Sequence, residues 1–304
     1  MVESEVLIPG DTSLTNEETD APIGIIRLQR ASLENVPSLL RKIRRQLIYD
    51  VGDGFLLQPH TDVALHIDFK GRVLTLDCSD ARLPVGAAWA IHAGLGAATL
   101  THGGLPLHGA GLEWAGKAFC LMADSGVGKS TLSWYLLRHG FLFRNDDLVP
   151  AHFDPSANPV QAVTYPSASL YPKLSREAVD RYGLDAATLP VADYGTDEEE
   201  YYVPLNRQER GLSSRVLNAI FLLRPVPEGG VKVERLPTET AVAPLFANLH
   251  TVWLIGKWMD SHRLQARCSL LANLVPVFEL RYTRSFAILP ALERAIQETL
   301  ENLP

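Results

Sequence analysis

Residues 123–131, Ala-Asp-Ser-Gly-Val-Gly-Lys-Ser-Thr, decide which fold this chain can adopt. The preceding residues 117–122, Lys-Ala-Phe-Cys-Leu-Met, are typical of a buried strand. Residues 129–138 have the spacing of an amphipathic helix, which His139-Gly140 would end. A strand, a glycine-rich turn and a helix in this order are typical of a phosphate-binding loop, here with Ala in place of the leading Gly. The stretch therefore predicts an α/β fold built around such a loop.

The residue types within the loop are those that phosphate binding requires. Gly126 and Gly128 let the backbone turn so that successive N–H groups point at phosphate oxygens, in a concavity that we expect a Cβ atom to crowd. Lys129 would neutralise the β- and γ-phosphates, and the Ser130 hydroxyl would ligate Mg²⁺ at the helix N-terminus. The alternative is a glycine-rich turn that caps a helix and binds nothing. The predicted nucleotide-binding residues are Asp124, Ser125, Gly126, Val127, Gly128, Lys129, Ser130 and Thr131.

Two acids and one histidine are the further candidate site residues. Asp146 and Asp147 follow an apolar strand at residues 141–144, and a parallel neighbour of the strand before the loop would bring them beside the phosphates. One carboxylate can then hold Mg²⁺ while the other accepts a proton from an attacking hydroxyl. His108 could bind a phosphate oxygen or steady the carboxylates. The alternatives are an Asp pair that opens a turn and a histidine satisfied within the core.

The chain divides into three predicted parts. Residues 1–20 mix acidic and small polar side chains without periodicity, which is typical of a flexible tail. Residues 21–83 predict a small, mostly β N-terminal α+β domain, and residues 84–304 predict the catalytic domain. Within the latter, the Ala-rich stretch at residues 84–100 predicts a helix, interrupted by glycines, that links the two domains.

Periodicity and turn residues give the other expected elements. Residues 36–47 predict a helix, Lys70-Gly71 predicts a hairpin turn, and residues 185–211, with their acidic run, predict a long mobile loop. The remaining predicted helices cover residues 241–274 and 287–302. The predicted strands cover residues 24–29, 63–69, 73–78, 105–114, 117–122, 141–144, 216–223, 231–234 and 277–282.

Charge and cysteine usage argue against several classes of protein. A formal net charge of −7 over 304 residues offers no basic field for a nucleic acid, so we expect no such partner. No apolar run reaches the length of about 18 residues that a membrane helix needs, so we expect no membrane association. Cys78, Cys120 and Cys268 are far apart and lack CxxC spacing, which argues against a disulfide framework and a zinc site and favours a cytoplasmic protein.

Taken together, His108-Gly109, residues 123–130, His139-Gly140 and Asp146-Asp147 resemble the catalytic domain of the HPr kinase/phosphorylase family in order and spacing. The similarity is specific over residues 105–149 and faint beyond. It implies an α/β, P-loop kinase core related to phosphoenolpyruvate carboxykinase, with ATP as phosphoryl donor and Mg²⁺ as cofactor. It places the family's roles as follows: active-site histidine at His108, phosphate-loop lysine at Lys129, metal-binding hydroxyl at Ser130, proton acceptor at Asp147, and at Asp146 the acidic companion that would share the metal.

One stretch departs from that family. HPr kinases carry a metal-binding Glu about 43 residues past the phosphate-loop lysine, whereas residues 164–172 here contain no acid. This puts the metal shell and any dephosphorylating activity in doubt. The Tyr-Pro…Leu-Tyr-Pro pattern of this stretch is similar to shorter HPr-kinase-like proteins, including those that phosphorylate a serine of a lasso-peptide precursor. Read independently, the prolines either shape an acceptor pocket or form a plain loop.

Three functional hypotheses follow from the sequence. The leading one is an ATP- and Mg²⁺-dependent kinase that acts on a hydroxyl, expected to be a serine of a peptide or protein substrate. The second is a kinase of a small-molecule hydroxyl, and the third is a nucleotide-binding regulator without transferase activity, motivated by Ala123 and the missing Glu. No arginine finger can be assigned, and Arg144, Arg207 and Arg215 are the candidates. Related enzymes form rings, so the resemblance also allows a homo-oligomer.

Overall fold

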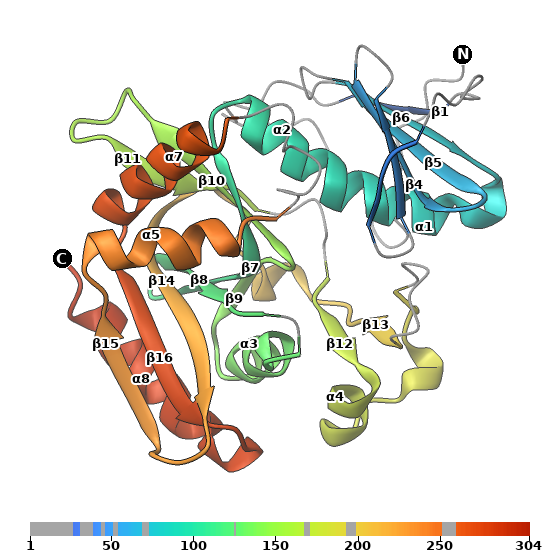
Figure 1. Cartoon of the computed structure of the whole chain (residues 1–304). Helices are drawn as coiled ribbons and strands as arrows, with labels where there is room; N and C mark the ends of the chain where they lie inside the picture. The colour runs from blue at the N-terminus through green and yellow to red at the C-terminus, as the bar shows by residue number, and fades with distance from the viewer. Residues whose placement is uncertain are drawn as a thin grey trace.

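The computed structural model describes residues 27–30, 39–43, 46–50, 54–68, 73–124, 126–166, 171–192, 199–250 and 260–304. They form a mixed α/β fold with a six-stranded sheet near the N-terminus and a larger eight-stranded sheet. Helices α1 and α2 run between the two sheets (Figure 1). The predicted tail at residues 1–20 and the turn at Lys70-Gly71 lie outside the described residues.

The N-terminal sheet has the strand order β1-β6-β5-β4-β3-β2, and all of its pairs are antiparallel except β1 with β6. Apolar residues alternate along β5, so one face of this strand is buried and the other is half-buried. The strand predicted at residues 63–69 is confirmed over the described residues 63–68, and the strand predicted at residues 73–78 is confirmed. The strands are β1 (Arg27–Arg30), β2 (Leu39–Ile43), β3 (Gln46–Asp50), β4 (Gly54–His60), β5 (Val63–Asp68) and β6 (Val73–Cys78).

The helix predicted at residues 36–47 is wrong, because β2 and β3 occupy this part of the chain. Both strands belong to an antiparallel ladder in which β3 pairs with β2 on one side and with β4 on the other. The ladder satisfies the backbone N–H and C=O groups that a helix would have satisfied locally, and tertiary pairing of this kind overrides a weak local helix preference.

The glycines of the predicted helix at residues 84–100 have a packing role. A Cβ at Gly86 would lie 2.7 Å from the Leu76 side chain, and one at Gly94 would lie 2.3 Å from that of Leu74. Glycine therefore lets the helical segment approach the sheet closely. The segment comprises the 3₁₀ turn η1 (Asp80–Arg82), α1 (Leu83–Trp89), the π-helical turn η2 (Ala90–Gly94) and α2 (Leu95–Thr101).

The larger sheet has the order β11-β10-β7-β8-β14-β16-β15, with β9 also paired to β7. At its centre, β8 runs antiparallel to β7 and parallel to β14. The strands predicted at residues 105–114 and 117–122 and the helix at 129–138 are confirmed with the same bounds. The elements are β7 (Leu105–Trp114), β8 (Lys117–Met122), α3 (Lys129–Arg138), β9 (Leu142–Asn145), β10 (Leu148–Asp154), β11 (Gln161–Thr164), β14 (Arg215–Val226), β15 (Val231–Arg235) and β16 (Val277–Thr283).

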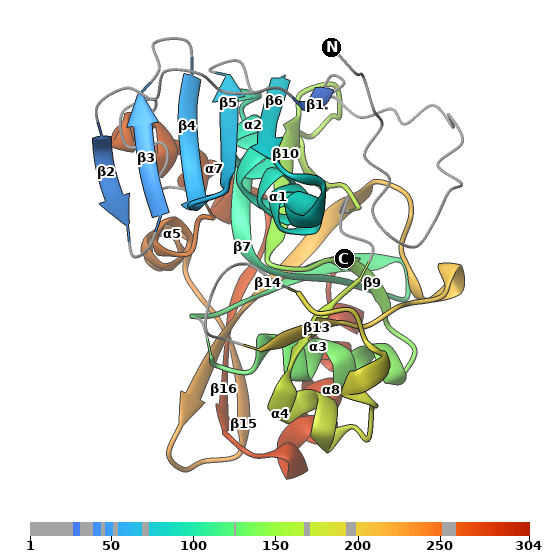
Figure 2. The ribbon, with the colours of Figure 1, turned by 90° about the vertical axis from the view of Figure 1, so that its right-hand side faces the viewer.

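Helices cover both faces of the larger sheet. One apolar cluster joins α3 and α8 to one face, and a second cluster joins α2, α5 and α7 to the other (Figure 2). The second cluster also includes Phe55 and Leu65 of the N-terminal sheet, so a single core crosses the domain boundary predicted after residue 83. Within the described residues, α5 and α7 confirm the helices predicted over residues 241–274. The bounds are α5 (Thr238–Ala247), α7 (Ser261–Leu274), the turn η5 (Phe286–Ile288) and α8 (Leu289–Glu301).

The long loop predicted at residues 185–211 holds short regular elements in its described parts, namely η3, β13 and η4, and its mobility stays a prediction. Strand β13 pairs with β12 in a two-stranded antiparallel sheet, and the first residues of α4 follow β12 directly. No helix within the described ranges is both long and apolar enough to cross a bilayer. The elements of this region are β12 (Lys173–Ser175), α4 (Arg176–Arg181), η3 (Ala186–Thr188), β13 (Glu200–Tyr202) and η4 (Arg207–Glu209).

Candidate active site

The predicted phosphate loop connects β8 to the N-terminus of α3. Gly126 and Gly128 have φ values of 77° and 107°, in the left-handed region that disfavours side chains. A Cβ at either position would meet no protein atom within 4 Å, so the crowding that we expected does not come from the protein. Glycine is required here by the backbone conformation. Ser125 lies outside the described residues. The loop therefore has the strand, turn and helix setting that the sequence predicted.

Lys129 occupies the first turn of α3 and folds back over the loop. Its Nζ donates to the carbonyl oxygens of Ala123 at 2.7 Å and Asp124 at 3.3 Å, and lies 3.4 Å from Nε2 of His108. Burial lowers the pKa of Lys129, and the negative charges of Asp147 and Asp146 oppose this shift. The ammonium is thus held at the loop, close to the predicted carboxylate pair.

Two tyrosines hold the backbone of the loop through hydrogen bonds to its carbonyl oxygens. The Tyr282 hydroxyl at the end of β16 donates to the Val127 carbonyl at 3.0 Å, and the Tyr182 hydroxyl donates to the Thr131 carbonyl at 3.0 Å. These bonds occupy carbonyl oxygens and leave the amide N–H groups of the loop for an anion. Neither tyrosine could be predicted from the sequence, because each comes from a distant part of the chain.

The acid pair lies at a break in a strand ladder along β7. In this ladder β9 pairs Asn145 with Gly111, and β10 pairs Leu148 with His108. Asp147 lies between the two strands with φ 61°, which Asp tolerates better than most residues. The prediction of a parallel neighbour is therefore wrong, because β7 lies between β8 and β9. The carboxylates reach the loop across β7 instead.

His108 connects the loop to the acid pair. Its Nδ1 lies 3.1 Å from the Asp147 carbonyl, which can only accept a hydrogen bond, so Nδ1 carries the proton. Nε2 is then the acceptor that faces the Lys129 ammonium. Burial and the adjacent Lys129 charge lower the pKa of His108, which keeps the ring neutral near pH 7.

The two carboxylates are in different electrostatic states. Asp146 is buried, and its oxygens accept from the backbone N–H groups of Asp147 at 3.1 Å and Lys173 at 2.8 Å. Burial and the neighbouring Asp147 charge raise the pKa of Asp146 to about 7. Burial would also raise the pKa of Asp147, but the Lys173 ammonium forms an ion pair with its Oδ2 and holds that pKa well below its ordinary range. Nζ of Lys173 also lies 3.6 Å from Glu200.

Two further histidines pack beside His108. The chain after α5 forms a bridge to β7, where the His250 N–H donates to the Pro106 carbonyl at 2.7 Å. The ring centroids of His250 and His108 are 5.8 Å apart, and those of His250 and His92 are 6.2 Å apart. Burial lowers the pKa of His92 to about 4 and that of His250 to about 3. The three neutral imidazole rings therefore lie together next to the acid pair.

Comparisons with known proteins assign no family to this chain. A scan against protein-family models gave no match, and a search of curated proteins gave none either. Among solved structures, the HPr(Ser) kinase/phosphatase from Coxiella burnetii is similar with a TM-score of 0.33 and 11% identity, over 64% of this chain and 89% of that chain. At these values the similarity carries no conclusion about activity.

The chain's own residues suit a magnesium ion bound together with phosphates. Magnesium prefers oxygen ligands and takes only one or two carboxylates, with phosphates and water completing its shell. Ser130 lies half-buried in the first turn of α3, and the Asp146 carboxylate keeps lone pairs beyond the two backbone bonds that it accepts. Within the described ranges, no group of three or more His, Cys, Asp or Glu residues could hold a metal ion by itself.

The structure brings together four predicted residues, Lys129, His108, Asp146 and Asp147, whereas their chemical roles stay predictions. It also adds Lys173, which follows directly on the stretch where the resemblance led us to expect an acid. Among the arginines, Arg144 is fully buried against Glu113 and therefore cannot serve as an arginine finger. Lysine at position 173 had no signal in the sequence, because its contact with the acid pair depends on where β12 lies.

Proposed function

We propose that this chain is a phosphotransferase that uses Mg²⁺ and ATP to phosphorylate a hydroxyl group, with a serine of a peptide or protein as acceptor. The proposal depends on one observation: His108 contacts both Lys129 of the phosphate loop and the carbonyl of Asp147, and the charges of Asp146 and Asp147 act on the Lys129 ammonium. A turn that only capped a helix would not need a lysine, an imidazole and two carboxylates at one place. Perturbed titratable groups gathered in this way are typical of active sites.

In the proposed reaction the bond between the γ-phosphorus and the bridging oxygen of ADP breaks, and a bond from phosphorus to the acceptor hydroxyl oxygen forms. The hydroxyl proton passes to Asp147. Lys173 occupies Oδ2 of this carboxylate, and no described residue donates to Oδ1, so Oδ1 is the acceptor atom. A depressed pKa suits a loose transition state, in which the proton leaves late and positioning contributes more than basicity.

Ser130 and Asp146 would hold the magnesium ion, which when bound neutralises charge on the phosphoryl group in transfer. Lys129 and the loop amides stabilise the same charge from the protein side. A nearby cation would also favour the ionised form of Asp146, whose pKa burial has raised to about 7. Lys173 supplies a further fixed positive charge, directly after the stretch where the sequence resemblance led us to expect a metal-binding acid.

A serine of a precursor peptide, of the kind phosphorylated in lasso-peptide biosynthesis, is the acceptor that the sequence resemblance favours. A nucleotide-binding regulator without transfer activity is the second candidate, because the Asp147 carboxylate is already engaged by Lys173. The two candidates differ in a measurable way. Only the phosphotransferase moves labelled phosphate from ATP to an acceptor.

The test is incubation with Mg²⁺, γ-labelled ATP and serine-containing peptides, together with calorimetry of ATP binding. Lys129→Ala should abolish transfer and weaken binding, whereas Asp147→Asn should abolish transfer and leave binding largely intact. Asp154→Asn, an acid at the far end of β10, is the matched control and should behave as the wild type does. Transfer by Asp147→Asn at the wild-type rate would exclude the proton-acceptor role. Failure of the wild type to bind ATP with Mg²⁺ would exclude the proposed function altogether.

A further inference from the structure

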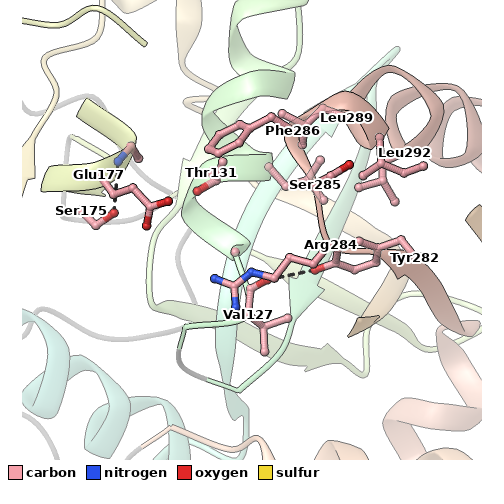
Figure 3. Close-up of a pocket in the computed structure, with 14 residues that line it drawn as sticks. Val127, Thr131, Ser175, Glu177, Tyr282, Arg284, Ser285, Phe286, Leu289 and Leu292 are labelled. Carbon is pink, nitrogen blue, oxygen red and sulfur yellow. Dashed lines mark hydrogen bonds between the residues drawn. The ribbon is translucent and has the colours of Figure 1, made fainter. Parts of the chain in front are cut away.

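A cavity of about 350 Å³ opens beside the phosphate loop (Figure 3). Its floor is formed by the loop and the first turn of α3, at Val127, Gly128, Thr131 and Leu132. One wall comes from the start of α4 and the other from the segment that joins β16 to α8. A ligand whose phosphates lie on the loop amides can therefore extend directly into this cavity.

Two charged residues make the opposite walls of the cavity chemically different. Arg284 extends from the β16–α8 segment across the foot of α3 toward the phosphate loop, and Glu177 lies on the opposite wall (Figure 3). The Arg284 guanidinium has no ion-pair partner among the described residues, so its charge is available to a ligand. A cation next to the loop favours phosphate, whereas a carboxylate repels phosphate and accepts hydrogen bonds from hydroxyl or amino groups. The phosphate end of a ligand therefore lies toward Arg284, and its uncharged end lies deeper in the cavity.

The rest of the lining suits a flat aromatic group. Buried side chains of Leu132, Leu289 and Leu292 form an apolar surface, and Phe286 presents an aromatic ring. The Arg181 guanidinium lies 4.6 Å from the centroid of the Phe286 ring, and this contact helps to hold the ring in place. An ordered aromatic ring above an apolar surface is a favourable partner for a nucleobase, because every base has a π-face.

We propose that this cavity binds the nucleoside part of the triphosphate, with the base against Phe286 and Arg284 on the phosphate nearest the ribose. Glu177 and the Ser285 hydroxyl then face the polar groups of the ribose and base. The proposal rests on the proposed function, since it takes the phosphates to lie on the loop. It adds the site that distinguishes a nucleotide from a bare polyphosphate.

The experiment compares the affinities of Mg²⁺-ATP and Mg²⁺-tripolyphosphate by calorimetry. Phe286→Ala should weaken ATP binding about tenfold, as expected when a base loses an aromatic partner, and should leave tripolyphosphate binding unchanged. Ser285→Trp, which fills the cavity from an exposed position, should have the same selective effect. Arg284→Ala should weaken both ligands. Arg281→Ala is the control, because this exposed β16 arginine pairs with Glu279 and does not line the cavity.

The possible outcomes separate the two proposals. If the wild type binds tripolyphosphate and ATP equally tightly, or if Phe286→Ala and Ser285→Trp bind ATP as the wild type does, the nucleoside lies elsewhere while the loop assignment stands. If the wild type binds neither ligand, the proposed function fails and the nucleoside site fails with it. Thermal melting of each variant shows whether it is folded, and the tripolyphosphate affinity shows whether the loop is intact.

Discussion

Replacement of Lys173 by Met should move the acidic limb of the pH–activity profile upward. Met keeps an unbranched side chain of similar length but removes the ammonium group that pairs with Asp147. The lysine side chain is 6% exposed and that of Asp147 is 30% exposed, so the pair is shielded on one side and in contact with water on the other. The expected effect therefore lies between that of a buried pair and that of a surface pair.

The size of the shift follows from simple electrostatics. Two unit charges about 4 Å apart interact by about 4 kcal/mol at an effective dielectric constant of about 20. One pKa unit corresponds to about 1.4 kcal/mol, which would give up to about 3 units. Because Asp147 is partly exposed, we expect a rise in its pKa of about 1 to 2 units. The activity of Lys173→Met should then be lost at a pH about 1 to 2 units higher than that of the wild type.

The sign of the stability change follows from the same pair. The pKa of Asp147 is depressed in the folded state, so the pair stabilises the fold above the unfolded pKa of 3.8, and this contribution is lost as pH falls through the folded value. Lys173→Met should therefore be destabilised by about 1 to 3 kcal/mol at neutral pH, and the difference from the wild type should shrink in acid.

The assay is the pH dependence of kcat/KM for phosphate transfer, supported by NMR titration of the aspartate carboxyl carbons, which needs no activity. Lys173→Arg keeps the charge and should keep the wild-type acidic limb. Lys232→Met removes an exposed lysine paired with Glu234 on β15 and should change neither profile nor stability. An acidic limb that stays in place in a folded Lys173→Met protein would refute the reasoning that Lys173 sets the ionisation of Asp147.

Three further predictions concern stability and binding. The pKa of Asp146 is raised from 3.8 to about 7, so its contribution to stability is present below the unfolded value and is lost as pH rises toward 7. The stability of Asp146→Asn should not fall over this pH range, and denaturant titrations at several pH values measure the difference. Glu113→Gln should lower the free energy of unfolding by about 3 kcal/mol, because it leaves the buried Arg144 charge uncompensated. Arg215 also pairs with Glu113 but is exposed, so Arg215→Ala should change the free energy of unfolding by less than about 1 kcal/mol. Gly128→Ala should destabilise the loop by about 1 to 2 kcal/mol through its φ of 107°, and calorimetry should show weaker ATP binding.

The centre of the fold could be predicted from the sequence because its signals are local. In β7, β8 and α3 the apolar pattern is continuous, and turn residues bound each element. The turn between β7 and β8 illustrates this: Ala115 and Gly116 both have positive φ, as a two-residue hairpin loop requires. The loop, His108 and the acid pair could be found in the same way, because they adjoin these elements.

The parts that could not be predicted depend on contacts between distant segments. Lys173 enters the site because β12 lies against the Asp146 carboxylate, and His250 enters because the chain after α5 pairs with β7. Neither residue is marked by spacing or by neighbours in the sequence. The helix predicted at residues 36–47 failed for a related reason, since a strand in a ladder is defined by its partners as much as by its own residues.

The conformation of Asp147 decides which substitution can test it. Its φ of 61° lies in the left-handed region, which Asp and Asn adopt more readily than residues without a short polar side chain. Asp147→Ala should therefore be less stable than Asp147→Asn by about 1 kcal/mol, although both variants lose the ion pair with Lys173 equally. Loss of activity in the Ala variant could then reflect a displaced carbonyl at His108 as much as a missing proton acceptor.

Denaturant unfolding of the two variants side by side measures this difference, with Asp154→Asn and Asp154→Ala as the matched pair on β10. Equal stability of Asp147→Asn and Asp147→Ala would mean that the backbone at the strand break relaxes without strain. A clear difference would show that the left-handed conformation of residue 147 limits which side chains this position tolerates, at the residue whose carbonyl accepts from the His108 ring. The Asn variant is then the one whose kinetics report on proton transfer alone.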